Sequence, residues 1–237
     1  MLVIPVLDLK AGAVVHARGG KRAAYRPIET PLAPGTSDPV AILAGLLGVF
    51  PFRTVYIADL DGIAGRGRNH DTTCALRLEV PAVTFWVDDG SATPAAVGAM
   101  ARMPNVRPVV GTETLRGLVE LDTLHRLGTA DAILSLDFKG GALLGPPEIL
   151  EYPDRWPQTI IAMTLAHVGA DQGPDLPRVR DIVRRAGAGR QVFAAGGVRD
   201  KADLVALRAA GATGVLVASA LHSGKIKAGD LEEIAGQ

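Results

Sequence analysis

The sequence predicts an α/β protein, a (β/α)8 TIM barrel built as a twofold internal repeat of half-barrels. Eight short apolar runs alternate with longer amphipathic segments over 237 residues, a common length for such a barrel. The short runs are apolar throughout, as strands buried on both faces should be. We expect one domain, residues 1–237, with half-barrels of about 1–128 and 129–237. The alternative is a doubly wound open sheet, whose halves would not be expected to match.

The expected strands and helices follow in chain order. The strands are residues 2–7, 54–58, 83–87, 107–110, 132–136, 159–163, 191–194 and 214–217. A capping residue followed by proline marks a helix start, and such pairs at Asp38-Pro39 and Thr93-Pro94 predict helices over 40–49 and 95–102. Amphipathic patterns predict three more helices, over 114–127, 177–186 and 200–210.

Composition limits the class of function. Lys plus Arg equals Asp plus Glu at 25 each, so there is no basic surplus for nucleic acid or for an anionic membrane. Cys74 is the single cysteine, which excludes an intrachain disulfide and a cysteine metal cluster. No apolar run is long enough to span a membrane and no secretion signal opens the chain, so we expect a cytoplasmic protein. The sequence does not predict an oligomeric state.

One motif occurs in both halves of the chain. Asp-x-Lys-x-Gly follows an apolar run at Asp8 and again at Asp137. Two carboxylates from opposite strands can divide the work of a general acid and a general base. The alternative is that each aspartate only ends its strand and turns the chain. Positions that follow other strands also match at one constant offset, with Gly197 in the place of Gly90 and Ala218 in the place of Gly111.

A glycine-rich segment, Ala195-Gly196-Gly197-Val198, lies between a predicted strand and a predicted helix. Glycine lets the backbone approach a ligand closely, and backbone amides near a helix start can bind an anion. The last strand ends at Ala218-Ser219, and the loops after strands seven and eight of a barrel commonly bind phosphate. We therefore expect phosphate at Gly196, Gly197, Ala218 and Ser219. The alternative is a simple tight turn.

Basic residues follow the first strand. The polar stretch 18–36 begins with Arg18, and it could close over an anionic substrate because loops after strands form the active-site face of a barrel. The alternative is a solvated surface loop. Lys10 and Lys139, each two residues after an aspartate, are further candidate ligands of a substrate or its phosphate.

Six segments resemble the histidine-biosynthesis barrels HisA and HisF, in the same order and over nearly the whole chain. They are residues 4–10, 58–62, 110–112, 134–137, 195–198 and 217–221. The resemblance is closer to HisA, which isomerises a phosphoribosyl-formimino aminoimidazole carboxamide ribotide by an Amadori rearrangement. It implies Asp8 as general base and Asp137 as general acid or its partner. Opening a sugar ring and removing a proton from C2 needs one proton donor and one acceptor, and no metal or organic cofactor.

The resemblance also implies a phosphate site in each half. Its contacts would be Gly196, Gly197 and Ser219 for one phosphate and Gly111 and Thr112 for the other. After the third strand, however, the family's glycine-rich loop is replaced by Asp88-Asp89-Gly90. Carboxylates repel phosphate, so we expect this half to bind a hydroxyl, an amine or a cation-bridged group. The alternatives are that one aspartate caps the next helix, or that Arg107 or the basic loop neutralises the pair.

The loop after the sixth strand departs as well. HisA proteins carry a threonine and an acidic residue there, where this chain has Met163 and Val168, with Thr164 and His167 beside them. His167 could titrate near neutral pH as a catalytic group. It could equally be a histidine of a surface loop.

These departures resemble a branch of HisA-related proteins found in methane-producing archaea and one-carbon-metabolising bacteria, which links the chain to one-carbon metabolism only by association. The leading hypothesis is a HisA-like isomerase of a small phosphorylated sugar or phosphoribosyl compound other than the histidine intermediate. The alternatives are true HisA, a HisF-type cyclase, and a non-catalytic barrel that binds a phosphorylated metabolite.

Overall fold

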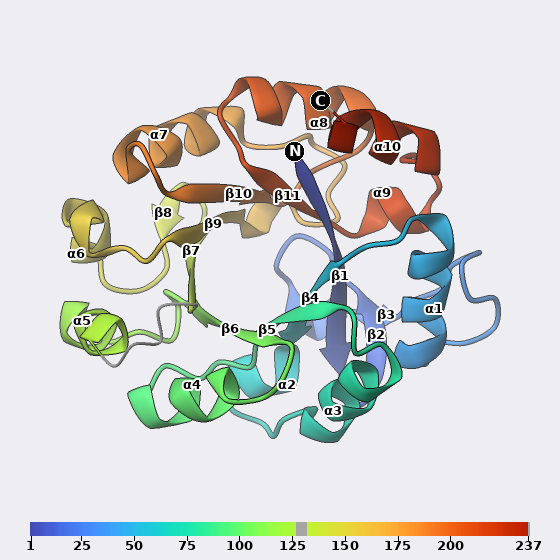
Figure 1. Ribbon diagram of the computed structural model, residues 1–237, viewed down its shortest axis with the longest axis horizontal. Helices are drawn as coiled ribbons and strands as arrows, with labels where there is room; N and C mark the ends of the chain where they lie inside the picture. Colours follow the sequence, from blue (N-terminus) through green and yellow to red (C-terminus); the bar gives the residue numbers. More distant parts are fainter. Residues whose placement is uncertain (127–131, 237) are drawn as a thin grey trace.

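The computed structural model describes residues 1–126 and 132–236, and it confirms the predicted barrel (Figure 1). Eight parallel strands follow one another around the barrel, and the last pairs with the first through Leu2 and Gly214. They are β1 (Leu2–Lys10), β4 (Thr54–Asp59), β5 (Thr84–Asp88), β6 (Val106–Gly111), β7 (Ile133–Lys139), β9 (Thr159–Thr164), β10 (Gln191–Ala195) and β11 (Gly214–Val217). The open-sheet alternative is therefore wrong. The expected boundary between half-barrels, at 128 and 129, lies outside the described residues.

Helices form the outer ring around the strands (Figure 1). The longer ones are α1 (Pro39–Val49), α3 (His70–Glu79), α4 (Pro94–Ala101), α5 (Leu118–Arg126), α7 (Leu176–Ala186), α8 (Lys201–Ala209) and α10 (Ala228–Gly236). Short ones are α2 (Leu60–Ile63), α6 (Glu148–Glu151) and α9 (Ser219–His222), with 3-10 turns η1 (Arg22–Ala24), η2 (Pro153–Arg155) and η3 (Leu165–His167). No helix in the described ranges is long and apolar enough to cross a membrane.

The predicted helix starts are confirmed by their caps. Asp38 Oδ2 accepts a hydrogen bond from the Ala41 amide at 2.9 Å, and Thr93 Oγ1 accepts one from Ala96 at 3.4 Å. The helix expected over 114–127 begins only at Leu118, because the Thr114 amide and hydroxyl both bond back to the Gly111 carbonyl. Residue 127, its expected end, lies outside the described residues.

The Asp-x-Lys-x-Gly motif encodes a hairpin in each half. Both β1 and β7 continue past the aspartate to the lysine and then reverse into a short antiparallel strand, β2 (Ala13–His16) or β8 (Ala142–Leu143). The two residues at each turn have positive φ, 51° and 78° at Ala11-Gly12, and 58° and 85° at Gly140-Gly141. This is the two-residue turn that suits the twist of a hairpin. A further strand, β3 (Arg26–Pro27), extends the first hairpin.

Apolar side chains fill the barrel and the space between barrel and helices. Inside the barrel, the rings of Trp86 and Phe193 meet edge to face with centroids 4.8 Å apart. Outside it, Leu7 and Leu9 point away from the axis and pack with Ile42 and Leu46 of α1. Since successive side chains of a strand alternate in direction, Asp8 between Leu7 and Leu9 points inward.

Gly214 tests the closure of the barrel. A Cβ at this position would lie 2.3 Å from the Phe193 ring and 2.7 Å from the Leu2 carbonyl. We expect Gly214→Ala to lower the free energy of unfolding by about 1 to 3 kcal/mol through overpacking, measured by urea denaturation. Gly48→Ala in α1, with nothing within 4 Å, is the control, and it should be more stable by about 0.5 to 1 kcal/mol. An unchanged Gly214→Ala would contradict the packing at this seam.

Candidate functional site

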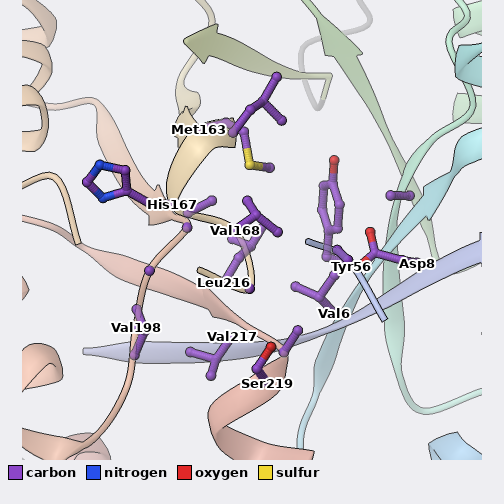
Figure 2. A pocket seen from close by; sticks show the side chains of 18 of the residues that line it. Val6, Asp8, Tyr56, Met163, His167, Val168, Val198, Leu216, Val217 and Ser219 are labelled. Carbon is purple, nitrogen blue, oxygen red and sulfur yellow. The ribbon is translucent and has the colours of Figure 1, made fainter. Parts of the chain in front are cut away.

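A cavity of about 310 Å³ lies at the carboxyl ends of the barrel strands. Figure 2 shows Asp8 and Tyr56 on one side of it, with Ser219, Val198 and His167 on its other sides. Around the barrel, β5 and β6 stand opposite β10 and β11. We call the wall formed by Asp88, Glu113 and Asp137 the acidic side, and the wall formed by Gly196, Gly197, Ala218 and Ser219 the glycine side.

Asp8 projects into the cavity from β1 and is half-buried. Among the described residues, its carboxylate has no hydrogen-bond partner. Burial raises its pKa to about 7, and the positive charge of Arg22 opposes that rise. Asp8 can therefore both lose and gain a proton near neutral pH.

Asp137 faces Asp8 from β7, four strands away around the barrel. Its carboxylate accepts hydrogen bonds from the Ser135 hydroxyl at 2.7 Å and from the Glu113 amide at 3.4 Å. Burial again raises the pKa to about 7, against the Ser135 hydrogen bond. The structure thus brings the two motif aspartates to one cavity on opposed strands, each with a pKa near neutrality.

Asp88 lies beside Asp137 on the acidic side. Its Oδ2 accepts a hydrogen bond from the Tyr56 hydroxyl at 3.4 Å, and its Oδ1 accepts one from the Gly90 amide at 3.1 Å. Burial, reinforced by the negative charge of Asp137, raises its pKa to about 8. Gly111 allows this crowding, because a Cβ there would lie 2.8 Å from Asp137 Oδ2 and 3.4 Å from Asp88 Oδ2.

Asp89 turns away from the cavity. Its carboxylate pairs with Arg68 at 3.4 Å and accepts a hydrogen bond from the Ser91 amide at 2.9 Å. The next helix is capped by Thr93, so the alternative that an aspartate caps it is wrong. Arg107 lies deeper in the barrel, 5.2 Å from the centre of the Trp86 ring.

Two further residues of the site, Arg22 and Glu113, were not singled out from the sequence. Arg22 reaches from the basic loop across the mouth and makes a two-pronged ion pair with Glu113, with distances of 2.7 and 2.9 Å. Their positions in the sequence could have marked them as site residues. Arg22 lies in the basic loop that was expected to close over the substrate, and Glu113 directly follows Gly111-Thr112.

The glycine side is shaped by backbone. Gly196 and Gly197 have φ of 101° and 87°, and a Cβ on either would lie 2.5 Å from the Thr164 carbonyl or 2.1 Å from the Gly173 carbonyl. No other residue fits at these two positions. Ser219 Oγ lies 3.5 Å from His16 Nε2.

The remaining predicted ligands are placed less centrally. Thr112 is fully buried, and its hydroxyl accepts the Asp137 amide at 3.0 Å. Lys10 donates to the Arg22 carbonyl at 3.1 Å, while Arg18 is exposed and does not line the cavity. Lys139 lines a separate outer cavity.

The loop after β9 contributes one of its two candidates. His167 lines the cavity, with Nδ1 2.7 Å from the Gly173 carbonyl oxygen. Thr164 is buried and does not line the cavity. Within the described part of the chain, no group of three or more His, Cys, Asp or Glu could hold a metal ion.

The closed parallel barrel and its cavity at the strand ends define a (β/α)8-barrel protein with a ligand site on the usual face. Residues 2–227 match the family model described as histidine biosynthesis protein. The chain belongs to this family.

The relatives carry two kinds of name. An uncharacterized protein of Methanocaldococcus jannaschii is 32% identical, covering 99% of this chain and 97% of its own. A 1-(5-phosphoribosyl)-5-((5-phosphoribosylamino)methylideneamino) imidazole-4-carboxamide isomerase of Myxococcus xanthus is 28% identical over 96% of each chain. The isomerase of the same name from Symbiobacterium thermophilum is 27% identical over 98% of this chain and 96% of its own. The expected resemblance to a methanogen branch, rather than to a close true HisA, is confirmed.

Asp88 should make stability depend on pH. The folded protein keeps a proton on Asp88 up to about pH 8, whereas the unfolded chain releases it near 3.8, so stability falls as pH rises through this window. Asn stays neutral, so we expect Asp88→Asn to gain stability relative to wild type between pH 4.5 and 8.5, on the order of 2 kcal/mol, in urea denaturation. Asp89→Asn is the matched control. If the free energy of unfolding depends on pH equally in Asp88→Asn and in wild type, the raised pKa of the buried Asp88 carboxyl group is contradicted.

Proposed function

We propose that this protein is an acid/base isomerase that converts a small phosphorylated aminoaldose to an aminoketose. The observation that carries this proposal is the pair Asp8 and Asp137, which face one cavity from opposite strands with pKa values near 7. Groups of such pKa transfer protons most effectively near neutral pH. Its family and the isomerase names of its relatives support the same class of reaction.

The two carboxyl groups would act in sequence. Protonated Asp137 gives its proton to the ring oxygen, the bond from C1 to that oxygen breaks, and the amine nitrogen forms a C1 iminium. Ionised Asp8 then takes the C2 proton to give an enaminol. Proton return to C1 and loss of the C2 hydroxyl proton give the aminoketose, so atoms and charge balance without an added reactant. These roles, Asp8 as base and Asp137 as acid, are the ones that the family resemblance implies.

We further propose that the phosphate binds on the glycine side only. Gly196 and Gly197 bring the backbone close to the cavity, and Ser219 and His16 add polar groups there. On the acidic side, Asp88, Asp137 and Glu113 present carboxyl oxygens in place of phosphate-binding donors, and each of them that ionises would repel a second phosphate. The isomerases among the relatives are named for a substrate with two phosphoribosyl groups. The acidic side therefore favours a different substrate, with one phosphate and a hydroxyl or amine end.

Two wider expectations belong with this proposal. We infer that the hairpins after Asp8 and Asp137 are equivalent parts of a repeated half-barrel, within one domain.

A non-catalytic phosphometabolite-binding barrel is the second candidate function. It is favoured by Met163 at the position where the resemblance implies a threonine.

Hydrogen exchange tests the proposed reaction. A panel of N-substituted ribosylamine 5-phosphates, including the histidine-pathway compound, would be incubated in D2O and followed by proton NMR for loss of the C2 signal and formation of ketose. We expect turnover of a panel member with one phosphate, reduced about 100- to 10,000-fold in Asp8→Asn and in Asp137→Asn. Asp71→Asn, on the exposed face of α3, is the control.

The outcomes separate the candidates. Turnover of the histidine-pathway compound alone would make the protein a true HisA. Binding without exchange would favour the non-catalytic barrel. Full activity in both aspartate variants would overturn the acid/base assignment.

A further inference from the structure

Arg22 places a positive charge at the mouth of the barrel, beside the acidic side of the cavity. It lies on η1, within the loop between β2 and β3, and its guanidinium makes the two-pronged ion pair with Glu113, which follows β6. The pair is partly shielded from solvent, with side chains 29% and 19% exposed. An arginine fork on a carboxylate fixes both partners in one geometry.

The other basic side chains that line the cavity stand at the glycine side. Arg199 bonds to Asp203 at 2.9 Å, and Lys225 pairs with Asp171 at 3.3 Å. Arg22 alone of the three lowers the pKa of both motif aspartates by its charge. Six charged or titratable groups face Arg22. Four are carboxyl groups of the cavity, Asp8, Asp88, Glu113 and Asp137. The other two are Tyr25 of the same loop and Lys10, whose Nζ donates a hydrogen bond to the Arg22 carbonyl.

The ion pair also forms a wall between two cavities. Arg22 and Glu113 both line the main cavity and both line the outer cavity of about 290 Å³ that holds Lys139. Glu113 itself is negative and, through its backbone amide, bonded to Asp137.

We propose that Arg22 is a positioning residue, which pairs with Glu113, serves as the shared counter-ion of Asp8 and Asp137, and favours the ionised form of both. This inference deepens the proposed function, since it takes the pair as the acid and base. Its consequence is that Arg22 and Glu113, although bonded to each other, act on Asp137 with opposite sign.

The test reads the carboxylates directly, so it does not depend on any substrate. The protein labelled with carbon-13 at aspartate Cγ would be titrated by NMR, with the Asp8 and Asp137 signals assigned from Asp8→Asn and Asp137→Asn. In Arg22→Gln we expect the pKa of both aspartates to rise by about one pH unit, because the opposing positive charge is lost. In Glu113→Gln we expect the pKa of Asp137 to fall, because the neighbouring negative charge is lost.

Two variants control for structure. Lys21→Gln removes an exposed charge from the same loop and should leave both titrations unchanged. Arg22→Lys keeps the charge without the fork, and it should restore most of the wild-type titration. Proton–nitrogen spectra would verify that each variant is folded, and if Arg22→Gln is not, Arg22→Met would remove the same charge in its place.

The pattern would differ if the ion pair of Arg22 and Glu113 only held the loop in place. Both Arg22→Gln and Glu113→Gln break that contact, so the pKa of Asp137 would then shift in the same direction in both variants. That result, or no shift in either, would overturn the proposal. If the titrations shift as expected but no substrate exchanges its C2 proton, the proposed reaction is wrong and the role of Arg22 as counter-ion is still supported.

Discussion

The burial of three carboxyl groups at one end of the barrel governs the rest of this site. Asp8, Asp88 and Asp137 line a common cavity, and burial opposes the ionisation of each. Neighbouring carboxyl groups that are both buried cannot ionise independently, so protons are shared among them near neutral pH. The fold meets this constraint with Arg22 as counter-ion and with Gly111, which leaves room for two carboxylates.

The same constraint explains how two similar hairpins could take different roles in the proposed reaction. The strands of Asp8 and Asp137 end in the same turn geometry, but their surroundings differ. Asp137 stands among Asp88, Glu113 and Ser135, whereas Asp8 has no hydrogen-bond partner among the described residues. Environments of this kind separate an acid from a base when the two side chains are identical. On this account the asymmetry of the walls matters more than the repeated motif.

The sequence predicted the barrel well because its strands are continuous apolar runs, and the caps at Asp38 and Thr93 marked two helix starts. The strands β2, β3 and β8 were missed because two to four residues carry no periodic pattern. The helix α3 was missed because Thr73 and Leu76 are its buried residues, too few to mark a face. The ion pair of Arg22 and Glu113 joins positions 91 residues apart, and only the closed barrel brings them together.

The division of the cavity into an acidic side and a glycine side is the central claim, and a phosphate-bound crystal structure tests it most directly. Crystals soaked with inorganic phosphate near pH 7.5 would be compared with an unsoaked crystal. The account predicts one phosphate at Gly197 and Ser219 and none between Gly90 and Gly111. Phosphate at both places, or at the acidic side alone, would contradict it.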